Sequence, residues 1–244
     1  MELWGLTDCG SVRRQNQDVF KTLEDEDRGI AVLVVCDGMG GARAGNVASA
    51  LAADSFTEYI GQYIENNADL GDAAEKMAEA VMRANHVVFE KSMSGDEYAG
   101  MGTTLTAALS YAGGEIVANI GDSRGYHVTR SGIKQITRDH SVVEDMIARG
   151  DLTRAEAHRH PKKNLITRAL GTSSHEAPDI FTLKLEQGEH LLLCSDGLTN
   201  VVFESEILFV LQQTDSVREC CYMLLDMALE RGAPDNVTAV IFRK

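Results

Sequence analysis

Residues 32–41 read VLVVCDGMGG, an apolar run that ends abruptly in an aspartate and a loop of glycines. The run of β-branched and other apolar residues predicts a strand buried in the core. The Asp37–Gly38 pair that follows is, by itself, an ordinary turn signal. A carboxylate at the end of a buried strand becomes informative when other strands of the same chain end in the same way.

Three more aspartates stand at the ends of predicted strands. Asp122 follows the apolar run in EIVANIGDSRG, and Asp196 follows the run in HLLLCSDGL. Asp235 reverses the order, since it comes just before the run in APDNVTAVIF. The end of one antiparallel strand lies beside the start of its neighbour. We therefore expect all four carboxylates to meet at one edge of the fold, although each alone is typical of a turn.

Carboxylates that gather near an apolar core repel one another, and burial raises their pKa values. Such a cluster needs a cation, and oxygen ligands without histidine or thiolate favour Mg²⁺ or Mn²⁺ over Zn²⁺. The pattern predicts a divalent, binuclear site for hard metal ions. Near the start, GSVRRQNQDVF adds Arg13, Asn16 and Asp18. A guanidinium beside metal ions is suited to bind phosphate, whereas a surface arginine before a strand is the simpler reading of that segment alone.

The 244 residues fit one large domain, because no repeat, low-complexity tract or linker composition marks a boundary. The formal net charge of -14 argues against nucleic acid and anionic membranes as partners. No apolar run approaches the roughly 20 residues that span a bilayer, and the start lacks the pattern of a signal peptide. With five cysteines and no CxxC spacing, we expect reduced thiols and a cytoplasmic protein.

Apolar periodicity predicts helices at 45–66, 72–91, 204–213 and 215–230. Short β-type runs predict strands with the sequences LWGLTD, DVFKTL, GIAVLVVCD, TTLTAALS, EIVANIGD, RGYHVT, DIFTLKLE, EHLLLCSD and NVTAVIF. Because the strands come in clusters and the helices in pairs, we expect an α+β fold in which helical layers cover the sheets.

A polar, locally helical segment reads DHSVVEDMIARGDLTRAEAHRHPKKNLITRALGT. It carries His158, Arg159 and His160, which could form a metal patch. The basic surroundings instead favour a solvated surface. We expect this segment to be an insertion beside the site.

Eight motifs spread over the whole chain occur together in a specific order and spacing. They are VRRQNQD, VCDGMGG, GTTLTAAL, NIGDSRG, TRDHS, ITRALGT, CSDGLTN and DNVTAV. In this joint pattern the chain resembles the metal-dependent serine/threonine phosphatases of the protein phosphatase 2C family, in their compact bacterial form. The resemblance implies a single catalytic domain over residues 1–244, folded as an αββα sandwich of two antiparallel sheets, with a flap at about 141–168.

The resemblance also implies a binuclear Mn²⁺ or Mg²⁺ centre with a weaker third site. Asp37 would bridge the two tightly bound metals, and the backbone carbonyl of Gly38 would bind one of them. Asp196 and Asp235 would complete the protein ligands of the other metal. The remaining roles are metal support through water by Asp18, phosphate binding by Arg13 and third-metal binding by Asp122.

Two departures from the family pattern bear on the chemistry, whereas a third, GARAG in place of the more usual histidine after the glycine pair, removes no metal ligand. Gln17 stands where many members have glutamate, which removes a negative charge near the second metal. Met39 stands where eukaryotic members have a histidine proposed as the general acid, so protonation of the leaving group is left to water or to another group.

The resulting hypothesis is a protein phosphatase that hydrolyses phosphoserine and phosphothreonine with a metal-activated water and opposes a serine/threonine kinase, acting as a monomer. A P-loop is excluded, because Asn46 and Val47 stand where that motif needs Lys and Ser or Thr. Two alternatives remain open. One is a non-catalytic phosphoprotein-binding module of the same fold. The other is a partner-switching phosphatase dedicated to an anti-sigma-antagonist, a type that typically lacks the arginine found here as Arg13.

Overall fold

The computed structural model describes residues 1–157 and 159–244, and its strands form two antiparallel sheets. The first sheet has the order β1 (Glu2–Asp8), β11 (Val237–Arg243), β10 (His190–Cys194), β7 (Arg124–Thr129) and β8 (Gly132–Gln135). The second has the order β2 (Asp18–Asp25), β3 (Ile30–Met39), β5 (Leu105–Tyr111), β6 (Gly114–Ile120) and β9 (Asp179–Leu183). The short β4 (Gly102–Thr103) pairs with the end of β3.

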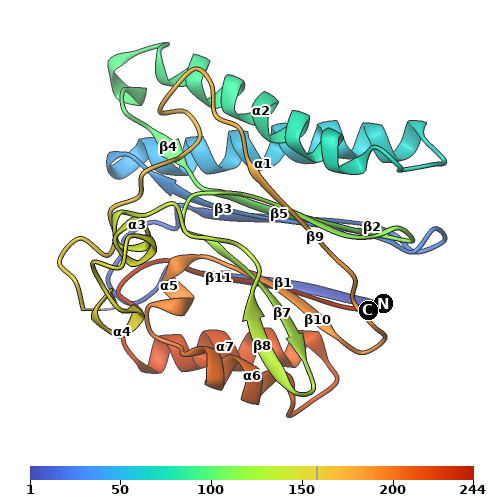
Figure 1. Ribbon diagram of the computed structural model, residues 1–244. Helices are drawn as coiled ribbons and strands as arrows, with labels where there is room; N and C mark the ends of the chain where they lie inside the picture. The colour runs from blue at the N-terminus through green and yellow to red at the C-terminus, as the bar shows by residue number, and fades with distance from the viewer. Residues whose placement is uncertain (158) are drawn as a thin grey trace.

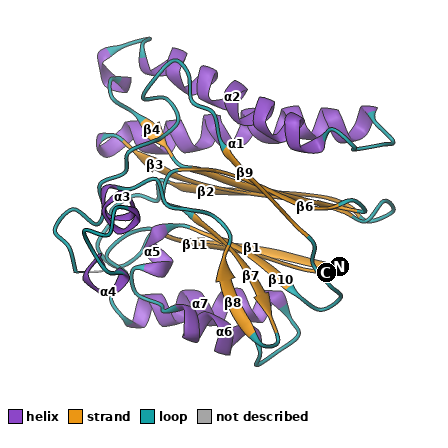
Figure 2. Ribbon diagram, viewed as in Figure 1, coloured by secondary structure: helices purple, strands orange, loops and turns teal. Residues whose placement is uncertain are grey.

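A pair of helices covers the outer face of each sheet (Figures 1 and 2). The helices α1 (Gly41–Asn66) and α2 (Ala73–Ser92) cover the second sheet, and α6 (Glu204–Leu211) and α7 (Val217–Glu230) cover the first. Shorter helices are η1 (Asp96–Tyr98), α3 (Val142–Ala148), α4 (Arg154–Ala157) and α5 (Asp196–Thr199). The predicted αββα sandwich is therefore confirmed.

The sequence around Asp37 explains the layering. On β3, Val32, Val34 and Cys36 pack against the helix pair α1 and α2. The alternate residues Leu33 and Val35 belong to the apolar layer between the two sheets. A strand that is buried on both faces needs a continuous apolar run instead of an alternating one. The VLVVC run therefore positions β3 in the middle of the sandwich, with Asp37 at its end.

The predicted elements appear with modest shifts of their ends. The first helix begins at Gly41, four positions before the predicted start at 45. The strand β8 has no counterpart among the predicted strands, and the predicted strand TTLTAALS is divided between β4 and β5, because two and four residues are too short to carry a period-2 pattern. All five cysteines are free thiols, and four of them are buried. No helix in the described part of the chain is long and apolar enough to cross a membrane.

The polar segment leaves the sandwich after β8 and carries α3 and α4 (Figure 1). Its two ends lie together, because Ser141 forms an antiparallel bridge with Ile166. The Val142 amide donates to the Leu165 carbonyl at 2.9 Å, and the Thr167 amide donates to the His140 carbonyl at 2.8 Å. Of the proposed histidine patch, His158 lies outside the described residues.

Candidate metal centre and phosphate site

One cavity of about 780 Å³ gathers most of the residues singled out from the sequence. Its borders include Arg13, Asp37, Gly38, Asp122, Asp196 and Asp235. They come from the end of β3, from the loop between β1 and β2, from the turn after β6, from the start of α5 and from the connection before β11. As expected, the antiparallel topology brings the four strand-end aspartates to one edge of the fold.

The pairing of β2 with β3 brings Asp18 directly opposite Asp37. The Gly38 amide donates to the Gln17 carbonyl at 3.1 Å, which draws the end of β3 against the chain before β2. A Cβ atom on Gly38 would overlap the carbonyl of Gly45 in α1. Only glycine therefore fits after Asp37, and its backbone lies beside the cavity.

Asp18, which pairs with Asp37, is only 4% exposed. Its Oδ2 accepts hydrogen bonds from Ser195 Oγ and Thr238 Oγ1, each at 2.7 Å. Its Oδ1 is buried without a hydrogen-bond partner among the described residues. Burial, the largest cause, raises the pKa of Asp18 to about 6. A buried carboxylate oxygen with no partner fits a residue that supports a metal ion through water.

The carboxylates around the cavity are buried and repel one another, so their ionised forms are unfavourable. Burial raises the pKa of Asp37, and the nearby carboxylates of Asp18 and Asp196 raise it further. Burial raises the pKa of Asp122, with Asp196 adding to the effect. Burial also raises the pKa of Asp196, followed by repulsion from Asp235. Ionised at neutral pH, this group would need compensating positive charge, which a divalent cation supplies.

Within residues 1–157 and 159–244, no three Asp, Glu, His or Cys side chains converge as a preformed metal site. The aspartates border one cavity but do not close around a single point. The donor set nevertheless fits Mg²⁺ or Mn²⁺, because these hard ions take oxygen ligands and Mg²⁺ keeps several of its waters. A group of carboxylates and one glycine carbonyl around a roomy cavity leaves space for those waters.

Arg13 lies at the same cavity but is paired with a carboxylate. Its Nη2 donates to Oδ2 of Asp235 at 2.7 Å, and this bond raises the pKa of Arg13. The backbone around the pair is fixed by Asn236, whose Nδ2 donates to the carbonyl of Gln15 at 3.0 Å. The Oδ1 of Asn236 accepts from the Gln17 amide at 2.8 Å. The arginine-bearing loop is therefore tied to the start of β11.

The two departures from the family pattern that bear on the chemistry both border the cavity. The side-chain amide of Gln17 lies beside Gly45 in α1. The terminal methyl of Met39 lies beside Gly102 in β4. A thioether has no proton to give, so Met39 cannot act as a general acid.

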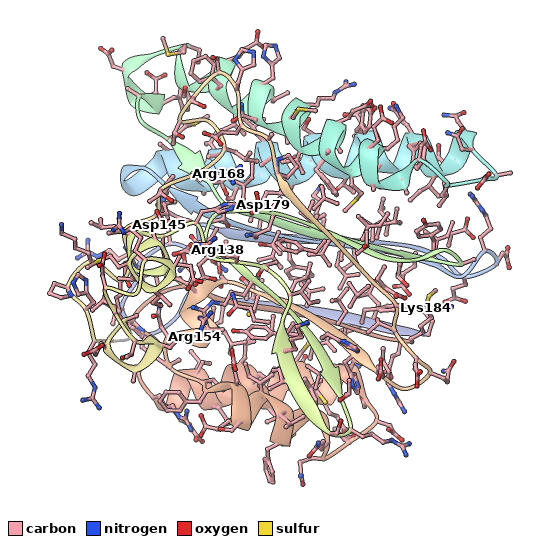
Figure 3. All side chains as sticks on the ribbon, in the orientation of Figure 1. Arg138, Asp145, Arg154, Arg168, Asp179 and Lys184 are labelled. Carbon is pink, nitrogen blue, oxygen red and sulfur yellow. The ribbon has the colours of Figure 1, made fainter. Side chains whose placement is uncertain are left out.

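The flap is anchored at its base by a polar cluster. The Nδ1 of His140 accepts from the Gly121 amide at 3.1 Å, next to Asp122 in the chain. The Nε2 of His140 lies 3.1 Å from Oδ2 of Asp179. Arg168 donates to the other oxygen of Asp179 at 3.0 Å, as the two side chains labelled in Figure 3 indicate. The base of the flap is thereby connected to the turn that carries Asp122.

Several residues of the site were not singled out from the sequence. They are Thr104, Ser123, His140, Ser195, Asn236 and Thr238, which form hydrogen bonds around the aspartates. Four of them, Ser123, His140, Ser195 and Asn236, stand directly beside an aspartate in the chain, whereas Thr104 and Thr238 do not. All six nevertheless lie within the motifs quoted from the sequence, and their place in a motif is the signal that could have identified them.

A second cavity of about 450 Å³ lies beneath the flap. It shares Asp122, Asn164 and Asp196 with the first cavity, so the two spaces adjoin. Other residues on its borders are Arg124, Asp139, Glu144, Arg154 and Lys163. The Nδ1 of His160 accepts from the nearby Lys162 amide at 3.2 Å, so a backbone group occupies that ring nitrogen.

Residues 9–226 match the family described as protein phosphatase 2C. The chain therefore belongs to the protein phosphatase 2C family, and the family predicted from the motifs is confirmed.

Known relatives match over nearly the full chain. A serine/threonine phosphatase named stp from Listeria welshimeri is 34% identical over 242 residues, which are 98% of this chain and 94% of that protein. The structure of the S. agalactiae serine/threonine phosphatase aligns with a TM-score of 0.90 at 34% identity, covering 100% of this chain and 99% of that one. The catalytic domain of the phosphatase PstP in complex with two manganese ions aligns with a TM-score of 0.84 at 35% identity, covering 98% and 96%.

Proposed function

We propose that the protein is a metal-dependent serine/threonine phosphatase that hydrolyses phosphoserine and phosphothreonine in proteins and so opposes a serine/threonine kinase. The observation that carries the proposal is the single cavity bordered by four aspartates, the backbone of Gly38 and the guanidinium of Arg13. Relatives that align over nearly the full chain are named as serine/threonine phosphatases.

The proposed cofactors are two tightly bound Mn²⁺ or Mg²⁺ ions and a weaker third. Asp37 and the Gly38 carbonyl would hold the tight pair, with Asp196 and Asp235 on one ion and Asp18 acting through water. Asp122 would hold the third ion together with Asp196. When bound, two such cations supply Lewis acidity and a water of lowered pKa for attack on phosphorus.

The residues of the chain would do the rest of the work. Arg13 would bind the phosphate oxygens, since a guanidinium can offer two parallel hydrogen bonds to an oxyanion. Its present partner Asp235 is a proposed metal ligand, so a cation on Asp235 would release Arg13 for the phosphate. Among the described residues that border the cavity there is no histidine. We therefore assign protonation of the leaving group to water.

The alternatives are less well supported. A non-catalytic phosphoprotein-binding module would not need four carboxylates around one cavity, since they repel a bound phosphate unless cations neutralise them. A dedicated partner-switching phosphatase is disfavoured by the presence of Arg13. The cytoplasm remains the proposed compartment because all five cysteines are free thiols. A monomer acting on phosphorylated proteins remains the proposed state.

The test uses one peptide sequence that carries phosphothreonine, phosphoserine or phosphotyrosine at the same position. Release of phosphate is measured with Mn²⁺ and with EDTA, for the wild-type protein and for Asp37→Asn. We expect release from the first two peptides only, and only with Mn²⁺ and the wild-type protein. Equal release in EDTA would overturn the metal-dependent assignment, and equal release from phosphotyrosine would overturn the proposed specificity.

A further inference from the structure

The hydroxyl of Thr104 connects two of the aspartates that border the cavity. Thr104 lies between β4 and β5 and is 3% exposed. Its Oγ1 accepts a hydrogen bond from the Asp37 amide at 2.9 Å. The same Oγ1 lies 2.8 Å from Oγ of Ser123, the residue after Asp122. One buried hydroxyl therefore contacts both the end of β3 and the turn after β6.

The hydrogen bonding around Asp37 makes this connection rigid. The Thr104 amide donates to the Asp37 carbonyl at 2.9 Å, so both backbone groups of Asp37 bond to the same residue. The neighbouring Thr103 hydroxyl also donates to the Asp37 carbonyl at 2.9 Å. A threonine hydroxyl accepts and donates at once, so Oγ1 can take the Asp37 N–H and still share a proton with Ser123.

The turn that carries Asp122 is also fixed from within the protein. Gly121 adopts a φ of 104°, where a side chain would be strained, and the methyl of Thr104 packs against it. The Thr106 hydroxyl has two acceptors within reach, Oδ1 of Asn119 at 2.6 Å and the Ser123 carbonyl at 3.1 Å. Ser123 itself is fully buried. The position of Asp122 relative to Asp37 is thus set by contacts with Thr104, just before β5, and with Thr106 on β5.

We propose that Thr104 is a positioning residue whose hydroxyl fixes the distance between the Asp37 and Asp122 carboxylates, and so the geometry of cation binding. This inference rests on the proposed function, since it concerns how the same cavity holds its cations. The physical reason is that a buried hydroxyl removed from two partners leaves both unsatisfied, which loosens the backbone that carries the ligands. A displacement of the reacting groups by even 1 Å can lower the rate about a hundredfold.

The test compares Thr104→Val with Thr104→Ser. Valine keeps the shape and removes the hydroxyl, whereas serine keeps the hydroxyl and removes the methyl. Mn²⁺ binding is measured directly from the paramagnetic resonance signal of free Mn²⁺, and turnover is measured with p-nitrophenyl phosphate. We expect Thr104→Val to bind Mn²⁺ about tenfold more weakly and to lose about tenfold in kcat, while KM changes less than about twofold. Thr104→Ser should stay within about threefold of wild type.

A matched control and a second variant separate positioning from general stability. Ser110 is a buried hydroxyl at the far end of β5, where it donates to Oε1 of Glu115 at 3.2 Å. Ser110→Ala should therefore bind Mn²⁺ as wild type does. Ser123→Ala removes only the second bond of Thr104 and should weaken Mn²⁺ binding by about threefold. Combined with Thr104→Val it should add nothing, because both changes break the same connection.

Four outcomes would overturn the inference. They are wild-type Mn²⁺ affinity in Thr104→Val, wild-type affinity in Ser123→Ala, an equal loss in Ser110→Ala, and failure of serine to restore binding. If Thr104→Val does not fold, Ser123→Ala and Thr104→Ser still test the inference, since wild-type affinity in Ser123→Ala contradicts the inferred connection. An inactive wild-type protein would refute the phosphatase proposal, and the Mn²⁺ measurement would still report on Thr104.

Discussion

The guanidinium of Arg13 lies 2.7 Å from Oδ2 of Asp235, in an ion pair at the cavity that Asp37 also borders. Arg13 is 54% exposed and Asp235 is 31% exposed, so the pair is screened by water and contributes little to stability. Its interest lies in chemistry, because it joins the proposed phosphate-binding group to a proposed metal ligand.

Replacing Arg13 with alanine should therefore impair phosphate binding. We expect Arg13→Ala to raise KM and to lower kcat/KM by about 10- to 100-fold, with Mn²⁺ affinity almost unchanged. The neighbouring Arg14 also borders the cavity, and Arg14→Ala changes the net charge equally. Steady-state kinetics on p-nitrophenyl phosphate compare the two. If Arg13→Ala weakens only Mn²⁺ binding, Arg13 supports Asp235 and does not bind phosphate.

Asp122 offers a test of the third cation. The turn around it is held by His140 and Thr106, so its carboxylate is not needed for those hydrogen bonds. We expect Asp122→Ala to keep two tight Mn²⁺ ions, to lose one weak ion and to turn over far more slowly at saturating Mn²⁺. A Mn²⁺ titration counts the ions. An unchanged count and kcat, with a stability loss of roughly 0.5 to 2 kcal/mol, would make Asp122 a turn residue.

The flap offers a test of substrate choice. The segment at about 141–168 covers the second cavity, which adjoins the first at Asp122, Asn164 and Asp196. Loops beside a rigid site commonly set specificity. Exchange of this segment for that of a relative should change the ranking of phosphopeptides more than it changes p-nitrophenyl phosphate hydrolysis. Equal changes in both rates would assign the flap to catalysis or folding.

His190 on β10 makes stability depend on pH. It is 8% exposed, its Nε2 has no hydrogen-bond partner among the residues described, and burial lowers its pKa to about 4. The unfolded chain binds the proton near pH 6.5. The stabilising contribution of neutral His190 is therefore complete above pH 6.5 and is lost as the pH falls toward 4.

Urea unfolding in EDTA at pH 7 and pH 5 measures this contribution. Wild type should lose about 2 kcal/mol more than His190→Leu over that interval, since one pKa unit corresponds to about 1.4 kcal/mol. The comparison between variants cancels the titration of the carboxylates around the cavity. Parallel losses in both proteins would show that His190 is not buried in its neutral form.

The layers of the fold and the gathering of the aspartates could be predicted from the sequence, because both follow from local patterns. A continuous apolar run implies a strand buried on two faces, and antiparallel pairing brings strand ends together. The connection from Thr104 to Asp37 spans 67 positions, and the pair of Arg13 with Asp235 spans 222. No periodicity encodes such contacts, because they depend on the register of separate strands.

The structural basis of the roles assigned to Gly38 and Asp18 also depends on contacts that no local pattern predicts. Asp-Gly after a strand reads as a turn, and only the packing of Gly45 against Gly38 shows why no side chain is tolerated. Asp18 reads as the first residue of a strand, and its unpartnered oxygen emerges only once Ser195 and Thr238 take the other one. The motif resemblance supplied these roles, and they stay predictions until metal binding is measured.

The most direct measurement is phosphate release from a phosphothreonine peptide by EDTA-treated protein as Mn²⁺ is added back, for wild type and Asp196→Asn. Asp196 borders both cavities and carries no proposed role other than metal binding. Wild type should be inactive without Mn²⁺ and regain full turnover with it, while Asp196→Asn stays folded and at least about a hundredfold slower. Full activity of Asp196→Asn, or of wild type in EDTA, would contradict a metal-dependent phosphatase.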